Sequence, residues 1–284
     1  MTDTQPMEQP SLAQQSNEIA HVVGVMSGKG GVGKSLVTGL LAIALRQAGL
    51  SVGILDADIT GPSIPKMFGI AGRPEVSELG IFPVETETGI KIISINLFLE
   101  NPDDPVIWRG PMISNTVNQF WQDVFWGKLD YLLVDLPPGT ADVPLTVMQS
   151  LPLDAVVVVT SPQDLAAMVV RKATIMCQKL NVPMLGLVQN MAYLKCPSCE
   201  EPIYPFGKTN GEELARNMGV PHLLDLPIDS EISTRADSGT IEKYAGNLFN
   251  SKIDAICNAV EALSFVKPRS TCSTGECCGN CSCE

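Results

Sequence analysis

The chain has 284 residues, of which 45% are hydrophobic, and this is enough for one large α/β domain or two smaller ones with a buried core. Nineteen Lys and Arg residues against 31 Asp and Glu residues give a net charge of −12, which disfavours non-specific binding to nucleic acid or acidic lipid. The two histidines, His21 and His222, are too few for a multi-histidine metal centre and argue against a Ser-His-Asp hydrolase.

Residues 1–20 are polar, with neither a basic start nor an apolar stretch, so we expect a flexible leader and not a signal peptide. No apolar run approaches the ~20 residues that span a bilayer. We therefore expect a cytoplasmic protein that binds no membrane. In that compartment its nine cysteines would stay reduced and would serve as ligands or in redox chemistry.

Apolar runs alternate with helical patterns from residue 21 to about 260. The run at 21–27 leads into a glycine-rich turn, and residues 35–48 have the apolar spacing of a helix that ends at Gly49. A second helix is predicted at 111–125, and a third begins at Ser161. Further strands are predicted at 51–56, 91–97, 131–135, 155–160 and 184–190. The last three are almost continuously apolar, which is typical of parallel sheet buried on both faces. The pattern predicts one α/β domain over 21–263, with a doubly wound, mostly parallel sheet.

The predicted first turn is a phosphate-binding loop (P-loop). Its sequence, Gly-Lys-Gly-Gly-Val-Gly-Lys-Ser, matches the pattern G-x-x-x-x-G-K-[ST] between a predicted strand and a predicted helix. The glycines permit torsions that point successive N–H groups at phosphates, and the positive end of the helix favours the same anion. We expect Lys34 to contact the β- and γ-phosphates of ATP and Ser35 to bind Mg²⁺. The predicted nucleotide-binding residues of the loop are Gly28, Lys29, Gly30, Gly31, Val32, Gly33, Lys34 and Ser35.

Acidic residues stand at the ends of two predicted strands. Asp56 and Asp58 follow the strand at 51–56, and Asp135 ends the strand at 131–135. Since the carboxyl ends of parallel strands converge on the ligand crevice of an open sheet, these side chains should lie near the P-loop. We expect Asp135 to contact the direct ligands of Mg²⁺ without binding the ion itself, and Asp58 to orient the attacking water. The alternative for each is a strand-end turn or cap.

The second lysine of the loop, Lys29, makes the motif similar to the deviant Walker A motif of the MinD/ParA/nitrogenase-reductase class. The resemblance implies a P-loop NTPase fold of the MinD-like (SIMIBI) kind. It also implies an ATP-bound, face-to-face homodimer in which Lys29 reaches the partner's nucleotide, so that Lys29 joins Lys34, Asp58 and Asp135 as a catalytic candidate.

Further segments narrow the resemblance. Together they resemble the Mrp/ApbC family of cytosolic ATPases that bind and transfer iron–sulfur clusters, over about residues 21–262. The segments are DADITGPSIPKMFG (56–69), WRGPM (108–112), LDYLLVDLPPGTAD (129–142), SPQDLAAMVVRKA (161–173), CPSC (196–199) and FG (206–207). The resemblance implies ATP hydrolysis coupled to cluster transfer into apoproteins, with Cys196 and Cys199 of two subunits holding one bridging [4Fe–4S] cluster. It also implies that Asp58 lies in switch I, Asp135 in switch II and Asn190 beside the adenine.

The spacing Cys196-x-x-Cys199, in a predicted loop at 191–208, leaves several chemistries open by itself. Two thiolates on a turn can bind one metal or two irons of a cluster, but they are half of a four-ligand site. The two-fold axis of a dimer would complete the site. A zinc site would need further ligands from the same chain, and a redox dithiol would need none. We favour the shared cluster.

The remaining cysteines divide into two groups. Cys177 and Cys257 lie in helical stretches and are predicted to be core residues. Residues 264–284 are predicted to be a flexible tail that could bind a second metal or cluster, supply the first site, combine with Cys196 and Cys199, or stay solvated and reactive. The tail cysteines are Cys272, Cys277, Cys278, Cys281 and Cys283.

Two other functions fit the same P-loop class. A MinD/ParA-type positioning ATPase would need a basic amphipathic helix or a basic surface, whereas this chain is acidic and ends in cysteines. A nitrogenase-reductase-like electron donor would use one cysteine from each of two separated positions. We therefore expect a cluster carrier whose partners are a second copy of the chain and apo iron–sulfur proteins, with no nucleic acid.

Overall fold

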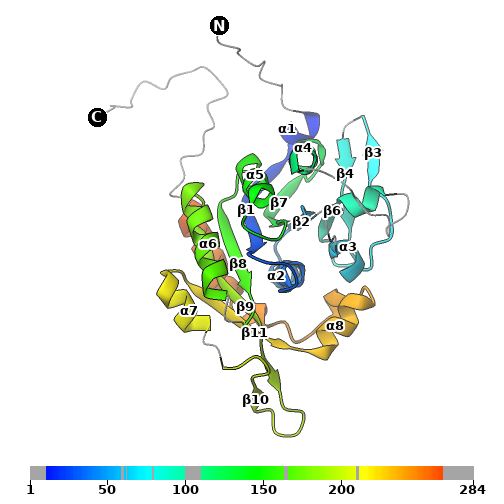
Figure 1. Cartoon of the computed structure of the whole chain (residues 1–284). Coiled ribbons are helices and arrows are strands. Elements are labelled where there is room, and N and C mark those ends of the chain that lie inside the picture. Colours follow the sequence, from blue (N-terminus) through cyan, green and yellow to red (C-terminus); the bar gives the residue numbers. More distant parts are fainter. Residues whose placement is uncertain are drawn as a thin grey trace.

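The computed structural model describes residues 11–58, 61, 63–78, 80–99, 110–162, 166–208 and 211–264. These residues form a nine-stranded sheet with helices on both faces (Figure 1). The strands run in the order β10-β9-β8-β1-β7-β2-β6-β5, with β11 also paired to β9. Only the β10–β9 and β5–β6 pairs of this sheet are antiparallel. The predicted doubly wound, mostly parallel α/β fold is confirmed.

The sheet contains β1 (Glu18–Ser27), β2 (Val52–Asp56), β5 (Val84–Glu85), β6 (Lys91–Ser94), β7 (Lys128–Asp135), β8 (Ala155–Thr160), β9 (Met184–Lys195), β10 (Pro202–Ile203) and β11 (His222–Ile228). A separate small hairpin contains β3 (Glu75–Ser77) and β4 (Gly80–Phe82). The α-helices are α1 (Leu12–Ser16), α2 (Lys34–Gln47), α3 (Ile64–Met67), α4 (Gly110–Asp123), α5 (Asp142–Ser150), α6 (Ala166–Lys179), α7 (Gly211–Met218), α8 (Ser230–Asp237) and α9 (Ile253–Ser264). Short 3₁₀ helices span Ile95–Phe98, Ile241–Lys243 and Leu248–Ser251.

The two faces of the sheet have separate apolar cores. One core packs the sheet against α2 and α9, and the other packs it against α4, α5 and α6. Consecutive residues of β7 enter opposite cores, since Leu133 lies in the first and Leu132 in the second. This alternation follows from the two-residue period of a strand, and it explains why the central strands are apolar throughout.

The described part of the domain begins before the predicted boundary at residue 21. Ser11 caps α1 by accepting a hydrogen bond from the Gln14 N–H at 3.2 Å, and Ala13 is buried. Glu18 and Ile19 already pair with β7. Backbone pairing thus holds residues that the polar composition assigned to a flexible leader.

Three further elements differ from the prediction. The strand predicted at 91–97 ends at Ser94, where the chain turns into the 3₁₀ helix Ile95–Phe98. The loop predicted at 191–208 is largely a β-hairpin, because β9 continues to Lys195 and pairs with β10. β11 had no counterpart in the predicted strands; its burial is only partial, so its apolar signal is weak.

Among the described helices, none combines the length and the apolarity that crossing a membrane requires.

Candidate functional site

The P-loop connects the end of β1 to the start of α2. Gly31 and Gly33 have φ of 79° and 82°, in the left-handed region that glycine adopts at little cost. A Cβ added to Gly30 or Gly31 would meet no heavy atom within 4 Å, so the space over the loop is open. The loop therefore has both the torsions and the open face that a phosphate group needs.

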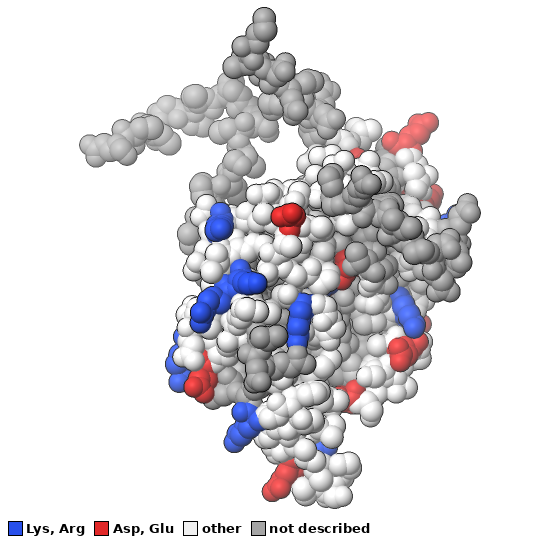
Figure 2. Space-filling view, in the orientation of Figure 1, with Lys and Arg blue, Asp and Glu red and all other residues white. Residues whose placement is uncertain are grey.

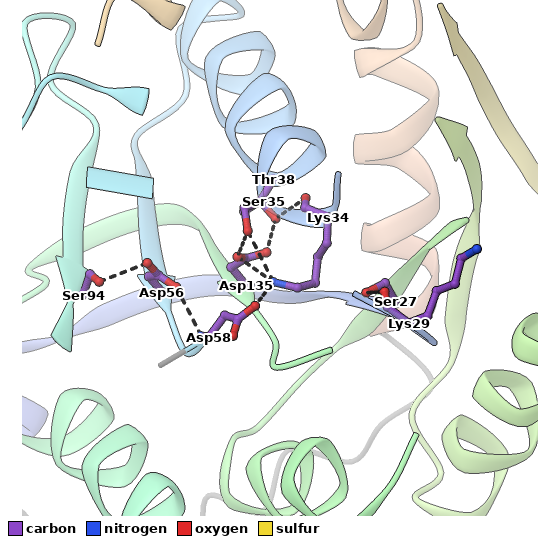
Figure 3. Close-up of polar contacts among 9 residues, drawn as sticks. All are labelled: Ser27, Lys29, Lys34, Ser35, Thr38, Asp56, Asp58, Ser94 and Asp135. Carbon is purple, nitrogen blue, oxygen red and sulfur yellow. Dashed lines mark hydrogen bonds and ion pairs between the residues drawn. The ribbon is translucent and has the colours of Figure 1, made fainter. Parts of the chain in front are cut away.

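Lys34 lies at the centre of a buried charge cluster (Figure 3). Its Nζ is 2.7 Å from Asp135 Oδ2 and 3.3 Å from Asp58 Oδ2, and the side chain is 5% exposed. Burial lowers the pKa of Lys34, but the carboxylates of Asp135 and Asp58 outweigh it and raise the pKa above its ordinary value. The ammonium group is thus held protonated at the first residue of α2.

Asp135 joins two hydroxyl groups of α2. Ser35 Oγ donates to Asp135 Oδ2 at 2.5 Å, and Thr38 Oγ1 donates to Asp135 Oδ1 at 2.7 Å. Hydroxyl and carboxylate oxygens are ligands that Mg²⁺ prefers, so Ser35 and Asp135 have the donor set for this ion. Thr38 was missed in the sequence, although its position four residues after Lys34 places it on the same face of the helix.

Asp56 and Ser94 extend the cluster across the sheet. Asp56 is fully buried, and its Oδ2 accepts a hydrogen bond from Ser94 Oγ at 3.0 Å. Its Oδ1 accepts from the Asp58 N–H at 3.2 Å. Burial, together with the nearby Asp135 carboxylate, raises the pKa of Asp56 well above its ordinary value. Ser94 was also missed, although it ends a strand as Asp56 and Asp135 do.

The two remaining residues predicted around the nucleotide lie apart from this cluster. The Lys29 side chain extends away from Lys34, Asp58 and Asp135 (Figure 3). Asn190 is buried against the loop, and its Nδ2 donates to the Val32 carbonyl at 2.9 Å. The structure therefore gives Asn190 a direct contact with the P-loop backbone.

Cys196 and Cys199 lie in the turn of the β9–β10 hairpin, which projects from the body of the molecule (Figure 1). The Cys196 N–H donates to the Glu201 carbonyl at 3.0 Å, and the Glu200 N–H donates to the Cys196 carbonyl at 2.9 Å. Cys196 is half-buried and Cys199 is exposed. Hydrogen bonds from the backbone of Ser198 and Cys199 lower the pKa of the Cys196 thiol below its ordinary value. The turn thus presents two thiols, one of them poised to ionise, which is the state that binds metal.

The described residues contain no group of three or more His, Cys, Asp and Glu side chains arranged to hold a metal ion. Within this part of the chain, Cys196 and Cys199 are accordingly a two-ligand set. Cys177 is buried in the core with a pKa raised by burial to about 11, and Cys257 packs partly against the core, as predicted. The tail cysteines lie outside the described residues.

Comparison with known proteins gives the family. The ParA family model described as NUBPL iron-transfer P-loop NTPase matches residues 18–261. An iron–sulfur cluster carrier protein from Clostridium perfringens is 48% identical over 234 residues, covering 80% of this chain and 82% of that protein. The cytosolic Fe-S cluster assembly factor NUBP2 of Bos taurus is 46% identical over 228 residues, covering 78% of this chain and 84% of that protein.

A solved structure of similar sequence has the same fold as this chain. A nucleotide-binding protein from Archaeoglobus fulgidus in complex with ADP has a TM-score of 0.74 and 45% identity, covering 81% of this chain and 91% of that one. The family model spans nearly all of the described domain, including the P-loop, the buried charge cluster and the cysteine hairpin. The chain therefore belongs to the NUBPL iron-transfer P-loop NTPase family and is an ATPase.

Proposed function

We propose that this protein is an ATP-dependent iron–sulfur cluster carrier, which holds one [4Fe–4S] cluster between Cys196 and Cys199 of two subunits and passes it to apoproteins. The observation that carries the proposal is the hairpin turn, where two accessible thiols sit next to each other and the pKa of one is lowered. Relatives named as iron–sulfur cluster carriers, 48% identical in one case, support the same cargo.

The symmetry of the cluster site follows from its ligand count. A [4Fe–4S] cluster takes four cysteine ligands, and the hairpin supplies two. A two-fold axis next to the hairpin brings the same pair from a second subunit and completes the set. Because the hairpin projects from the body of the protein, its turn is free of the sheet that would otherwise block a symmetric approach (Figure 1).

Bound ATP with Mg²⁺ would supply a phosphoanhydride bond whose hydrolysis changes the charge on the P-loop. For this the loop backbone would bind the phosphates, and Lys34 would be shared between them and the carboxylates that now hold it. Ser35 would bind Mg²⁺ with Asp135 behind it, and Asp58 would orient the attacking water. Asn190, already bonded to the loop, would lie beside the adenine.

Lys29 has a separate role in the proposed dimer. Its side chain points away from the buried cluster of its own subunit, which supports a contact across the interface with the partner's nucleotide (Figure 3). Closure of the dimer around ATP would then fix the position of one cysteine hairpin relative to the other. ATP turnover would change this relative position, and with it the exposure of the bridged cluster to solvent.

The rival class, an ATPase that positions cargo on DNA or membranes, would need an extended basic surface. Basic side chains do gather over α6 on the face shown in Figure 2, where Arg171, Lys172 and Lys179 are exposed. Three cations are few beside the roughly 6–10 phosphate contacts of a typical DNA-binding protein. We therefore propose that the partners are a second copy and recipient apoproteins, and not nucleic acid or membrane. We place the protein in the cytoplasm, in line with the name of the Bos taurus relative.

The test is anaerobic reconstitution of the full chain with iron and sulfide, followed by metal, sulfide and protein assays. We expect about four irons per dimer and a brown colour near ~400 nm from thiolate–iron charge transfer. Cys196→Ser or Cys199→Ser should remove both and leave ATP binding intact, whereas the matched control Cys257→Ser should keep them. Zinc in place of iron would favour a structural metal site, and about four irons per monomer without the tail would rule out sharing.

A further inference from the structure

The buried charge cluster contains one carboxylate for which the proposed reaction has no direct use. Asp56 ends β2, and the strand register places it directly beside Ser94 of β6 and Asp135 of β7. It is fully buried, so no face of it is open to a nucleotide or to bulk water. Burying a carboxyl group costs free energy unless both oxygens have hydrogen-bond partners. The presence of a carboxyl group at this buried position therefore needs an explanation.

Both oxygens of Asp56 are engaged by donors from different segments. Oδ2 accepts from the Ser94 hydroxyl at 3.0 Å, which ties the side chain to the neighbouring strand. Oδ1 accepts from the backbone N–H of Asp58 at 3.2 Å, which ties the same side chain to the chain leaving the sheet. The carboxyl group is therefore a bridge between β6 and the residue that we assign to the attacking water.

The bridge is one of the contacts that hold Asp58 in place. Asp58 lies beyond the last paired residue of β2, one residue past the Ala57 N–H, which still donates to the Asp135 carbonyl at 3.0 Å. Its carboxylate is nevertheless held 3.3 Å from Lys34 Nζ and almost fully buried. A turn at a strand end would need only the contact to the Asp58 N–H. The second contact, to Ser94, fixes the Asp56 side chain itself and so restricts where Asp58 can lie.

We propose that Asp56 is a positioning residue, which with Ser94 fixes Asp58 for ATP hydrolysis without touching the nucleotide or the attacking water. The inference rests on the proposed function of Asp58. Misplacing a reacting group by about 1 Å can cost on the order of 100-fold in rate, so a bridge of this kind has a measurable effect.

The experiment measures kcat and KM for ATP, and the affinity for a fluorescent ATP analogue, on the full chain. Asp58→Asn alone tests the role of Asp58 and should slow turnover. Asp56→Ala should lower kcat by roughly 10- to 100-fold, with nucleotide affinity changed by no more than about threefold. In the Asp58→Asn background, Asp56→Ala should have little further effect on kcat, because the group it positions is already lost.

Two milder variants and one control separate positioning from general damage. Asp56→Asn keeps an oxygen that can accept from the Asp58 N–H, so it should restore most of the kcat lost in Asp56→Ala. Ser94→Ala should lower kcat less than Asp56→Ala does. The matched control is Ser51→Ala, which removes a hydrogen bond of 2.6 Å to Asp130 before the start of β2 and should leave kcat unchanged.

Several results would overturn the inference. If Asp58→Asn slows turnover but Asp56→Ala does not, Asp58 keeps its role and Asp56 loses the proposed one. If the losses of Asp56→Ala and Asp58→Asn multiply, the two residues act independently. If Asp58→Asn leaves turnover unchanged, Asp58 does not orient the attacking water, and the positioning role of Asp56 is then contradicted as well. Should Asp56→Ala not fold, the same comparison is made with Ser94→Ala in the two backgrounds, and equal losses in Ser94→Ala and Ser51→Ala would contradict positioning.

Discussion

Asn190 occupies the space that a side chain on Gly33 would need. A Cβ on Gly33 would lie 2.2 Å from Asn190 Nδ2, which is hydrogen-bonded to the Val32 carbonyl. The P-loop at Gly33 and strand β9 at Asn190 are therefore packed against each other. This contact links the conformation of the loop to a strand far away in the sequence.

Gly33→Ala should destabilise the protein through this contact. The left-handed torsion costs an L-residue about 1–2 kcal/mol, and Asn190 must also move. The thermal midpoint should fall by at least roughly 2 °C, given about 2–4 °C per kcal/mol for a domain of this size. Gly30→Ala is the matched control, since a Cβ there meets nothing within 4 Å. Equal midpoints for the two variants in a thermal melt without nucleotide would refute the packing argument.

Lys34→Ala should abolish tight ATP binding. It removes the cation that would contact the β- and γ-phosphates, a loss of about 3 kcal/mol or roughly 100-fold in affinity. Titration with a fluorescent ATP analogue measures the affinity, and circular dichroism shows whether the variant is folded. Lys179→Ala, on the exposed end of α6, is the control. If a folded Lys34→Ala protein bound the ATP analogue with full affinity, the assignment of residues 28–35 as the phosphate-binding loop would be wrong.

Lys29→Ala should reduce hydrolysis more than binding. Its side chain leaves the cluster of its own subunit, so its proposed contact forms only in the closed dimer. A cation supplied in trans to a transferring phosphoryl group is typically worth ~10³-fold or more in kcat, so we expect a loss on the order of 100-fold or larger. Nucleotide affinity and kcat are measured on the same preparation. Equal losses of the two quantities would argue against a role across the interface.

Cys196 should be alkylated at lower pH than Cys177 and Cys257, whose pKa values burial raises. The thiolate is the reactive form, and backbone hydrogen bonds lower the pKa of Cys196, whereas burial raises the pKa of Cys177 to about 11. The rate of Cys196 modification should therefore rise through a midpoint below the ordinary thiol value of 9.0. Iodoacetamide labelling of the metal-free protein across a pH series, read by peptide mass spectrometry, measures each site. A midpoint for Cys196 at or above 9.0 would contradict the hairpin geometry.

A chain that ends at Lys267 should fold and bind ATP as the full chain does. α9 ends at Ser264, whose Oγ lies 3.2 Å from His21 Nδ1, so the last described helix is anchored without the residues that follow. Thermal melts and nucleotide titrations compare the two chains. Aggregation or loss of nucleotide binding would show that the tail contributes to the fold. Full iron content in the shortened chain would show that the tail is not the main cluster site.

The sequence by itself determined the features that depend on neighbouring residues. The P-loop is contiguous, so its glycines, Lys34 and Ser35 could be predicted from spacing alone; the glycines lie between β1 and α2, and Lys34 and Ser35 are the first two residues of α2. The strongly apolar strands were also predictable, since burial on both faces leaves no polar positions. The convergence of Asp58 and Asp135 next to the P-loop was also predictable, because the carboxyl ends of parallel strands lie at the same edge of a sheet.

The tertiary structure decided everything that depends on which strands pair and in what register. The contacts of Thr38 with Asp135 and of Ser94 with Asp56 join segments that are far apart in the sequence. Glu18 and Ile19 are held by pairing with β7, and the cysteine turn is held between the paired strands β9 and β10. A polar or mixed sequence carries no local signal of such partners, because backbone hydrogen bonds between strands form regardless of side chain.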